Sequence, residues 1–152
     1  MTFSKNLLLV FAALFLLVAC QDTNQTDGKD TTNREVIEKH NDGSPKQVKI
    51  LNEAGDTIKE IRYYKNGQKE MEGPLKKNRR HGTWKAYYKD GAIWSSARYN
   101  HGKQHGPYTT YYSNGHIRYK GQMHMDERTG KWIFYNRQGK IIKEIDYDKN
   151  QE

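Results

Sequence analysis

Cysteine, proline and aliphatic side chains are all scarce in this 152-residue sequence. The one cysteine, Cys20, excludes an intrachain disulfide, and the length suits a single domain. Hydrophobic residues make up only 34% of the chain, whereas phenylalanine, tryptophan and tyrosine together reach 12%. A chain poor in aliphatics but rich in tyrosine and tryptophan favours a β-sheet surface over a packed globule.

Motifs of catalysis are also lacking. The sequence contains no Gly-x-Ser-x-Gly elbow, no P-loop, no nucleotide-binding glycine pattern and no helix with paired histidines. Its histidines and aspartates fall mainly in predicted turns, where polar residues are common for structural reasons. We therefore expect a protein that is not an enzyme and that uses no cofactor.

The one long apolar run spans residues 7–19 and follows Lys5. It is shorter than the roughly 20 residues that a membrane-spanning helix needs, which indicates a signal peptide at residues 1–19. The run ends in Leu-Val-Ala-Cys at residues 17–20, which resembles the bacterial lipobox. This resemblance implies cleavage before Cys20, acylation of Cys20 and anchoring in a membrane of the cell envelope, with the leaflet left open. The alternatives are an ordinary signal peptide or an uncleaved anchor, with Cys20 incidental.

Residues 20–45 are polar and nearly free of apolar side chains. Their aspartate, threonine, asparagine and glycine favour local side-chain bonding over regular structure, so we expect a flexible tether. Within it, residues 34–40 are compatible with a short helical turn. An exported chain of this kind would rarely meet nucleic acid, so no nucleic-acid partner is expected.

A 24-residue repeat organises the rest of the chain. Several columns keep one register without an insertion, which identifies a repeat protein. A second match, between residues 55–66 and 139–150, places the repeat domain at 46–148 and leaves 149–152 as a tail. The columns are Gly67, Gly91, Gly115 and Gly139; Gly82, Gly106 and Gly130; Trp84, Tyr108 and Trp132; and Tyr63, Tyr87, Tyr111 and Tyr135.

Each Asn-Gly or Asp-Gly pair predicts a two-residue turn between two strands. With that turn at residues 90–91, Tyr88 faces Ile93 and Trp84 faces Ala97. One face of the sheet then sets large rings opposite small residues, a pairing that avoids clashes. Because exposed rings invite aggregation, we expect twist of the sheet, together with a second copy or a partner, to cover them.

The opposite face is polar apart from a stripe of tyrosines at positions 87, 111 and 135, beside which the same register places Trp94. It also sets Arg118 opposite Tyr111, a plausible cation–π pair. The stripe has two interpretations, which stay open: a surface for a partner, or ordinary cross-strand pairing on a half-wet sheet.

Residues 99–108, with the sequence YNHGKQHGPY, resemble the MORN repeat, whose core phrase is Tyr-x-x-Gly-Lys-x-x-Gly. The Tyr-Tyr-x-Asn-Gly phrase and the 24-residue step are similar to the bacterial MORN variant over residues 55–147. The resemblance implies an all-β, elongated antiparallel meander of about four hairpin repeats, used for protein association or membrane-proximal scaffolding. Lipid binding has also been proposed for the family, and some bacterial members are named as antitoxins. Residues 77–78 and 125–126 depart from the His-Gly step at 101–102, so the pattern does not define those two turns.

The loops opposite the Asx-Gly turns should stack along one edge of the sheet. Their charge changes along this edge from strongly basic to slightly acidic. Much of the net charge of +8 lies at residues 76–80, which suits an anionic partner. The other interpretation is a solvated edge without a partner. With the tyrosine stripe, the candidate partner-binding residues are Lys76, Lys77, Arg79, Arg80, His81, His101, Lys103, His105, Tyr87, Trp94, Tyr111, Arg118 and Tyr135.

Four histidines, at positions 81, 101, 105 and 124, lie on or beside this edge and suggest zinc. No carboxylate or thiol completes a ligand set at the usual spacing, so we expect no metal site.

These observations favour an envelope lipoprotein, held in the membrane through Cys20, whose non-catalytic repeat domain mediates protein–protein interaction or scaffolding, self-association included. One alternative is a module that binds a membrane surface or glycan through the basic loop edge. Another is an antitoxin or immunity-type protein that neutralises a cognate toxin.

Overall fold

The computed structural model of the protein describes residues 33–149. The predicted signal peptide, Cys20 and the tether up to residue 32 lie outside the described residues, as do residues 150–152. Within the described range, no helix is long and apolar enough to cross a membrane.

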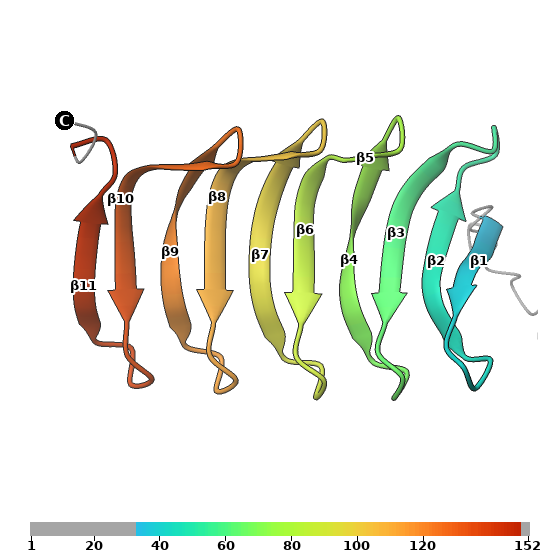
Figure 1. Ribbon diagram of the computed structural model, residues 1–152, viewed down its shortest axis with the longest axis horizontal. Coiled ribbons are helices and arrows are strands. Elements are labelled where there is room, and N and C mark those ends of the chain that lie inside the picture. Colours follow the sequence, from blue (N-terminus) through green and yellow to red (C-terminus); the bar gives the residue numbers. More distant parts are fainter. Residues whose placement is uncertain (1–32, 150–152) are drawn as a thin grey trace, which may run out of the picture.

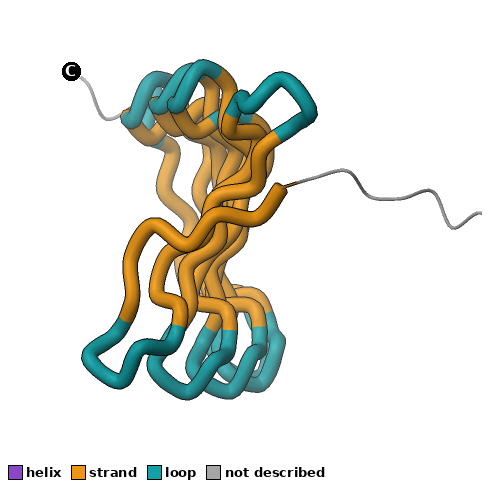
Figure 2. The backbone as a smooth tube through the Cα atoms, turned by 90° about the vertical axis from the view of Figure 1, so that its right-hand side faces the viewer, coloured by secondary structure: helices purple, strands orange, loops and turns teal. Residues whose placement is uncertain are grey.

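The described residues form one open antiparallel sheet, which confirms the predicted all-β meander (Figure 1). Its strands follow one another in sequence order, except that the short β5 pairs only with β4. Viewed along the row of strands, they form a twisted layer with the turns gathered at its two ends (Figure 2). The strands are β1 (Asn33–Lys39), β2 (Pro45–Leu51), β3 (Thr57–Tyr63), β4 (Lys69–Lys76), β5 (Arg79–Arg80), β6 (Gly82–Tyr87), β7 (Ile93–Asn100), β8 (Lys103–Tyr111), β9 (Ile117–His124), β10 (Glu127–Tyr135) and β11 (Ile141–Asp146).

The sheet begins earlier than composition predicts. Residues 33–45, expected to belong to a flexible tether with a short helical turn, instead hold strand β1 and the turn that follows it. The reason lies in the 24-residue period: His40 and Gly43 stand one step before Tyr64 and Gly67 and close the same kind of turn. Polar composition concealed this strand because nearly all its stability comes from pairing with β2.

Five turns of one kind lie along one edge of the sheet, the turn edge. In one of them, the Tyr88 N–H donates to the Ala92 carbonyl oxygen at 2.8 Å, and the Gly91 N–H donates to the Tyr88 carbonyl oxygen at 2.9 Å. This is a three-residue loop with Gly91 in the left-handed region (φ 89°), so the predicted two-residue turn is wrong. The register shifts by one residue beside the loop, and Tyr87, not Tyr88, is opposite Ile93. The turns span residues 40–44, 64–68, 88–92, 112–116 and 136–140.

The opposite edge, the loop edge, carries the tighter turns. Three hairpin tips are two-residue turns in which both residues have positive φ, a geometry that matches the twist of paired strands. The three loops that the sequence places opposite the Asx-Gly turns therefore share the same two-residue tip geometry. The tip residues are Lys77 and Asn78 (φ 50° and 57°), His101 and Gly102 (49° and 95°), and Met125 and Asp126 (51° and 77°).

A ladder of side-chain hydrogen bonds joins successive repeats near the turn edge. The Tyr88 hydroxyl donates to the Tyr111 carbonyl oxygen at 2.7 Å, which links each repeat to the backbone of the next. Such a bond satisfies the polar end of a ring that packs on the sheet. The other rungs are His40 Nε2 to the Tyr63 carbonyl (3.0 Å), Tyr64 to the Tyr87 carbonyl (2.8 Å) and Tyr112 to the Tyr135 carbonyl (2.8 Å).

One row of neighbours crosses the sheet on the front face, defined as the face that carries Trp84. The predicted pairs of Trp84 with Ala97 and of Tyr108 with Gly121 are confirmed. The tightest packing, however, is against the preceding strand, since a Cβ built on Gly73 would lie 2.3 Å from the Trp84 ring. A glycine is therefore required beside this ring. The row runs Glu35, Lys49, Glu60, Gly73, Trp84, Ala97, Tyr108, Gly121, Trp132 and Ile145.

The apolar side of the sheet changes face between β3 and β4. Val48 and Ile61, which are 0% and 8% exposed, lie on the back face, the face that carries Lys85. At the same level the front face carries Lys49 and Glu60. From β6 onward the buried rings are on the front, so the core consists of two small clusters on opposite sides of one sheet.

Gly121→Ala should destabilise the sheet because the added Cβ would lie 2.3 Å from the Trp132 ring. We expect a loss of about 1–3 kcal/mol in the free energy of unfolding, measured by urea denaturation with tryptophan fluorescence. Ala97→Gly, in the same column one repeat earlier, is the control and should cost about 1 kcal/mol or less. Equal losses in the two variants would contradict the packing requirement at Gly121.

Candidate functional site

Arg80 turns inward from the loop edge and covers a tryptophan on the front face. Its Cζ lies 4.2 Å from the centroid of the Trp84 ring, and its guanidinium donates to the Tyr99 hydroxyl at 3.4 Å. A guanidinium over an indole face is favourable, most of all where water is excluded. Arg80 was predicted as part of a docking edge, but the structure places its charge over Trp84 instead.

The same set recurs two repeats further along. Arg128 lies 4.4 Å from the Trp132 ring centroid and donates to the Tyr147 hydroxyl at 2.6 Å. Sequence reasoning missed Arg128 altogether and missed the covering role of Arg80, although each arginine stands four residues before a tryptophan in the 24-residue register. That spacing was the available signal.

The middle repeat carries a smaller, matching set. Gln104, Tyr108 and Ala97 stand where the flanking repeats have arginine, tryptophan and glycine. Gln104 donates to the Tyr99 hydroxyl at 3.1 Å. Burial raises the pKa of Tyr108 to about 12, with a further contribution from the neighbouring Tyr119. The ring, the small residue beside it and the residue at the arginine position therefore change together from one repeat to the next.

The front-face tryptophans need no second molecule to cover them. Trp84 is 3% exposed and Trp132 is 1% exposed within the single chain. The expectation that a copy or partner must bury these rings is wrong, because Arg80 and Arg128 cover them in place.

Trp94 is the tryptophan that stays open to solvent, with 41% of its side chain exposed. It lies at a front-face pocket of about 170 Å³ whose lining includes Arg80, Trp84, Tyr99 and Tyr108. The prediction set Trp94 on the opposite face, with the tyrosine stripe. The one-residue shift beside the turn at 88–92 is the reason for the difference.

The tyrosine stripe itself lies on the back face as predicted. Tyr87, Tyr111 and Tyr135 are half-buried and occupy alternate strands. The predicted pair of Tyr111 with Arg118 is wrong, since Tyr111 pairs with Ile117. The Arg118 Cζ lies 5.8 Å from the ring centroid of Tyr112 instead, again because of the shift beside a turn.

A carboxylate holds one end of this stripe. Glu72 accepts a hydrogen bond from the Tyr87 hydroxyl at 2.8 Å and forms ion pairs with Lys59 at 2.6 Å and Lys69 at 3.0 Å. Burial would raise the pKa of Glu72, but the three donors outweigh it and lower this pKa to about 2. Burial and the same carboxylate raise the pKa of Tyr87 to about 12. The group is therefore a fixed, ionised polar cluster.

The loop edge presents the remaining basic candidates. Lys76, Lys77, Arg79 and Lys103 are exposed there. The predicted stacking of the tips is confirmed by bonds between neighbouring tips, such as the Gly102 N–H donating to the Arg80 carbonyl oxygen at 2.8 Å.

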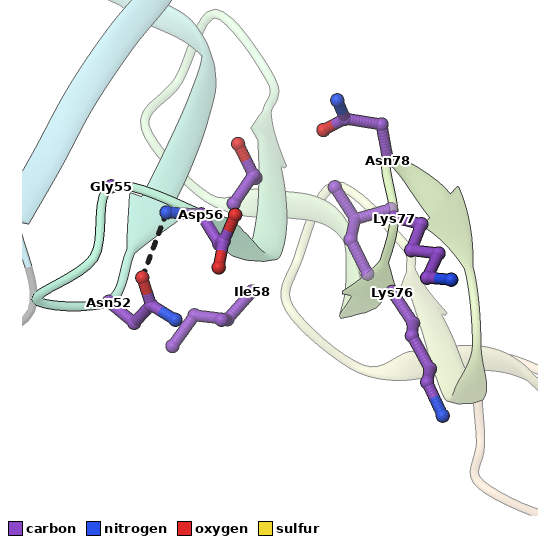
Figure 3. A pocket seen from close by; sticks show the side chains of 9 residues that line it. Asn52, Gly55, Asp56, Ile58, Lys76, Lys77 and Asn78 are labelled. Atoms are coloured by element: carbon purple, nitrogen blue, oxygen red, sulfur yellow. Dashed lines mark hydrogen bonds between the residues drawn. The ribbon is translucent and has the colours of Figure 1, made fainter.

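Two of these lysines line a pocket of about 470 Å³ between their tip and the turn at 52–56 (Figure 3). That turn is held by the Asp56 N–H, which donates to Asn52 Oδ1 at 2.8 Å. Figure 3 shows Lys76 and Lys77 extending away from Asp56, so their ammonium groups do not converge on one point. The pocket is polar and open, without the focused charge that holds a single anion.

The histidines near this edge meet in pairs. The ring centroids of His81 and His101 are 5.3 Å apart, and those of His105 and His124 are 4.9 Å apart. Across residues 33–149 no group of three or more histidine, cysteine, aspartate or glutamate side chains could hold a metal ion. Two imidazoles fall short of the four ligands of a structural zinc site.

The fold and its repeated columns define the class: an open β-sheet repeat protein in which each repeat contacts only its neighbours. Within that class, residues 80–101, 104–124 and 128–149 match the MORN repeat variant. The matched units begin at Arg80, Gln104 and Arg128, and the structure continues the same period toward the N-terminus through the turns at 64–68 and 40–44. Among curated proteins, none matches the chain.

Arg128→Gln should expose Trp132 to water, because glutamine cannot cover an indole ring as a guanidinium does. We expect a red shift of tryptophan emission, stronger quenching by iodide and a loss of about 1 kcal/mol in stability. The matched control is Arg79→Gln, at an exposed arginine of the loop edge, which should leave the emission unchanged. Unaltered quenching in Arg128→Gln would contradict the covering role.

Glu72→Gln should weaken the fold at neutral pH and flatten its pH dependence. Because the folded pKa of about 2 lies below the ordinary 4.5, the ionised carboxylate stabilises the fold above pH 4.5, and this contribution disappears as the pH falls toward 2. We expect a loss on the order of 1–3 kcal/mol at pH 7, measured by urea denaturation across a pH series. Glu127→Gln, at an exposed tip, is the control. If the free energy of unfolding of Glu72→Gln depended on pH as steeply as that of the unmodified chain, the stabilising role of ionised Glu72 would be refuted.

Proposed function

We propose that this chain is a lipid-anchored envelope protein whose repeat sheet binds another protein without catalysis. The lipobox-like residues 17–20 support an anchor at Cys20. Residues 20–33 span at most about 50 Å when fully extended, so the sheet would work close to the membrane surface. The match of three segments to the MORN repeat variant supports a scaffold of repeats as the working part.

The observation that carries the proposal is the exposure of Trp94 beside a cluster of rings. Trp94 is 41% exposed, and the neighbouring Ile93 is 40% exposed. The adjoining pocket supplies Tyr99, Tyr108 and Arg80. Tryptophan, tyrosine and arginine around a small hollow are the side chains that most often dominate protein–protein interfaces. Because Arg80 is already held by Trp84, the surface is preorganised and loses little side-chain entropy on binding.

A second candidate is a membrane-surface or glycan-binding module that uses the loop edge. The exposed Lys76, Lys77, Arg79 and Lys103 favour it. Such binding would weaken steeply as salt rises, whereas binding through Trp94 would not. A toxin neutralised by this protein would be one kind of partner for the Trp94 surface.

Photocrosslinking in intact cells tests the proposal. A photoreactive residue at Trp94 should yield a discrete protein adduct, and the same residue at Thr83, exposed elsewhere on the sheet, should not. After detergent extraction, the partner should stay bound at high salt when Lys76 and Lys77 are changed to glutamate. Adducts that contain only lipid or cell-wall material, or a partner lost on lysine replacement, would overturn the Trp94 assignment.

The anchor has a separate test: Cys20→Ala should release the chain from membranes.

A further inference from the structure

The sheet ends in two strands, β1 and β11, and neither has a strand beside its outer edge among residues 33–149. Both expose aliphatic side chains: Val36 is 40% exposed, Ile37 45%, Ile141 48% and Ile142 63%. An end strand that only avoids aggregation usually presents charges, whereas these two present charges and aliphatics together. Such an edge is a template for another strand.

We propose that β11 of one copy of this chain pairs with β1 of a second copy, so that the sheet continues from molecule to molecule. The path through the sheet has ten strands that alternate in direction. β1 of a second copy in the same orientation is therefore antiparallel to β11, as the meander requires. No strand has to reverse or leave its own sheet.

The faces also agree across such a junction. Glu35 and Ile145 belong to the front-face row described above, so Lys143, two residues from Ile145, shares the face of Glu35. Arg34, two residues from Val36, lies on the back with Glu144. The back-face row runs Val36, Val48, Ile61, Glu72, Lys85, Ser96, Thr109, Lys120, Ile133 and Glu144.

One register matches both charge and apolar character. When Glu144 lies opposite Arg34 of the second copy, Lys143 lies opposite its Glu35. Both are pairs of opposite charge on the correct face. The same register brings Ile142 and Ile141 to the level of Val36 and Ile37 of the second copy, where each strand carries a bulge, at Ile142 and at Ile37. Directly opposed pairs of opposite charge stabilise antiparallel strands, and the aliphatic side chains beside them add apolar contact.

Pairing of like ends is less favourable. A two-fold axis perpendicular to the sheet would pair an end strand with the same strand of a second copy. The two strands would be antiparallel, and the front faces of the two sheets would lie on the same side. Every such register of β11 sets an aliphatic side chain against a charged one, for example Ile141 against Lys143. The same holds for β1, where Glu35 meets Ile37 or Val36 meets Glu38. Head-to-tail pairing avoids these conflicts, and because it does not close on itself it produces a linear array.

Two of these charges already have contacts within their own chain, and both contacts are exposed. Arg34 donates to the Tyr63 hydroxyl at 3.2 Å and lies 5.6 Å from the centroid of that ring. Glu144 pairs with Lys131 at 2.9 Å, but the two side chains are 43% and 59% exposed. Exposed ion pairs of this kind contribute little and rearrange readily. The junction uses neither Trp94 nor the loop edge, so it extends beyond the proposed partner surface and can fail or succeed independently of it.

Disulfide trapping in the full-length, membrane-extracted protein tests the junction. Glu35→Cys and Lys143→Cys in one chain place two thiols directly across the proposed strand pair, within reach of a disulfide. Under mild oxidation this double variant should form a ladder of multimers on a non-reducing gel. Either single variant alone should stay monomeric, and a mixture of the two should give dimers and nothing larger. Glu35→Cys with Thr83→Cys is the matched control and should give no ladder.

Charge reversal supplies a second readout without cysteine. Lys143→Glu should weaken self-association about fivefold or more in analytical ultracentrifugation, and adding Glu35→Lys should restore it. A dimer from either single cysteine variant would mean that like ends pair, and would overturn the proposal. The absence of a ladder from the double variant would overturn it equally, while leaving the Trp94 crosslink untouched.

Discussion

Trp84 and Trp132 each pack flat against a glycine of the preceding strand, beneath an arginine of their own repeat. A single sheet has no second layer, so it cannot bury large rings in the usual way. The glycine lets each ring approach the backbone, and the guanidinium takes the place of the missing layer. Register, turn geometry and the 24-residue period all have to keep these three groups together, which is why they recur as a unit.

This way of building a core shapes what the protein can offer to others. The front rings are covered by their own chain, and the back face is occupied by fixed polar groups such as the Glu72 and Tyr87 cluster. The large apolar side chains that stay exposed in the described residues lie beside the turns or in the two end strands, and Trp94 is one of them.

Periodicity predicted much of the fold and less of the candidate site. The columns placed Trp84 opposite Ala97 and Tyr108 opposite Gly121 because alternation within a strand follows directly from its extended backbone. The turn length was not so determined: an Asx-Gly pair fits both a two-residue turn and a three-residue loop. The extra loop residue decided the face of Trp94 and the partner of Arg118. An error of one residue in the turn therefore placed these side chains wrongly on the surface.

The all-β repeat architecture, its period and the pairing of a ring with a small residue could all be predicted from the sequence, because they depend on local alternation and on columns that every repeat shares. The three-dimensional structure was needed to show that arginines cover the tryptophans and that the apolar side changes face between β3 and β4. Each of these depends on contacts between residues of different strands. Which residues meet is set by how whole strands pair with one another, and no single strand pattern encodes that pairing.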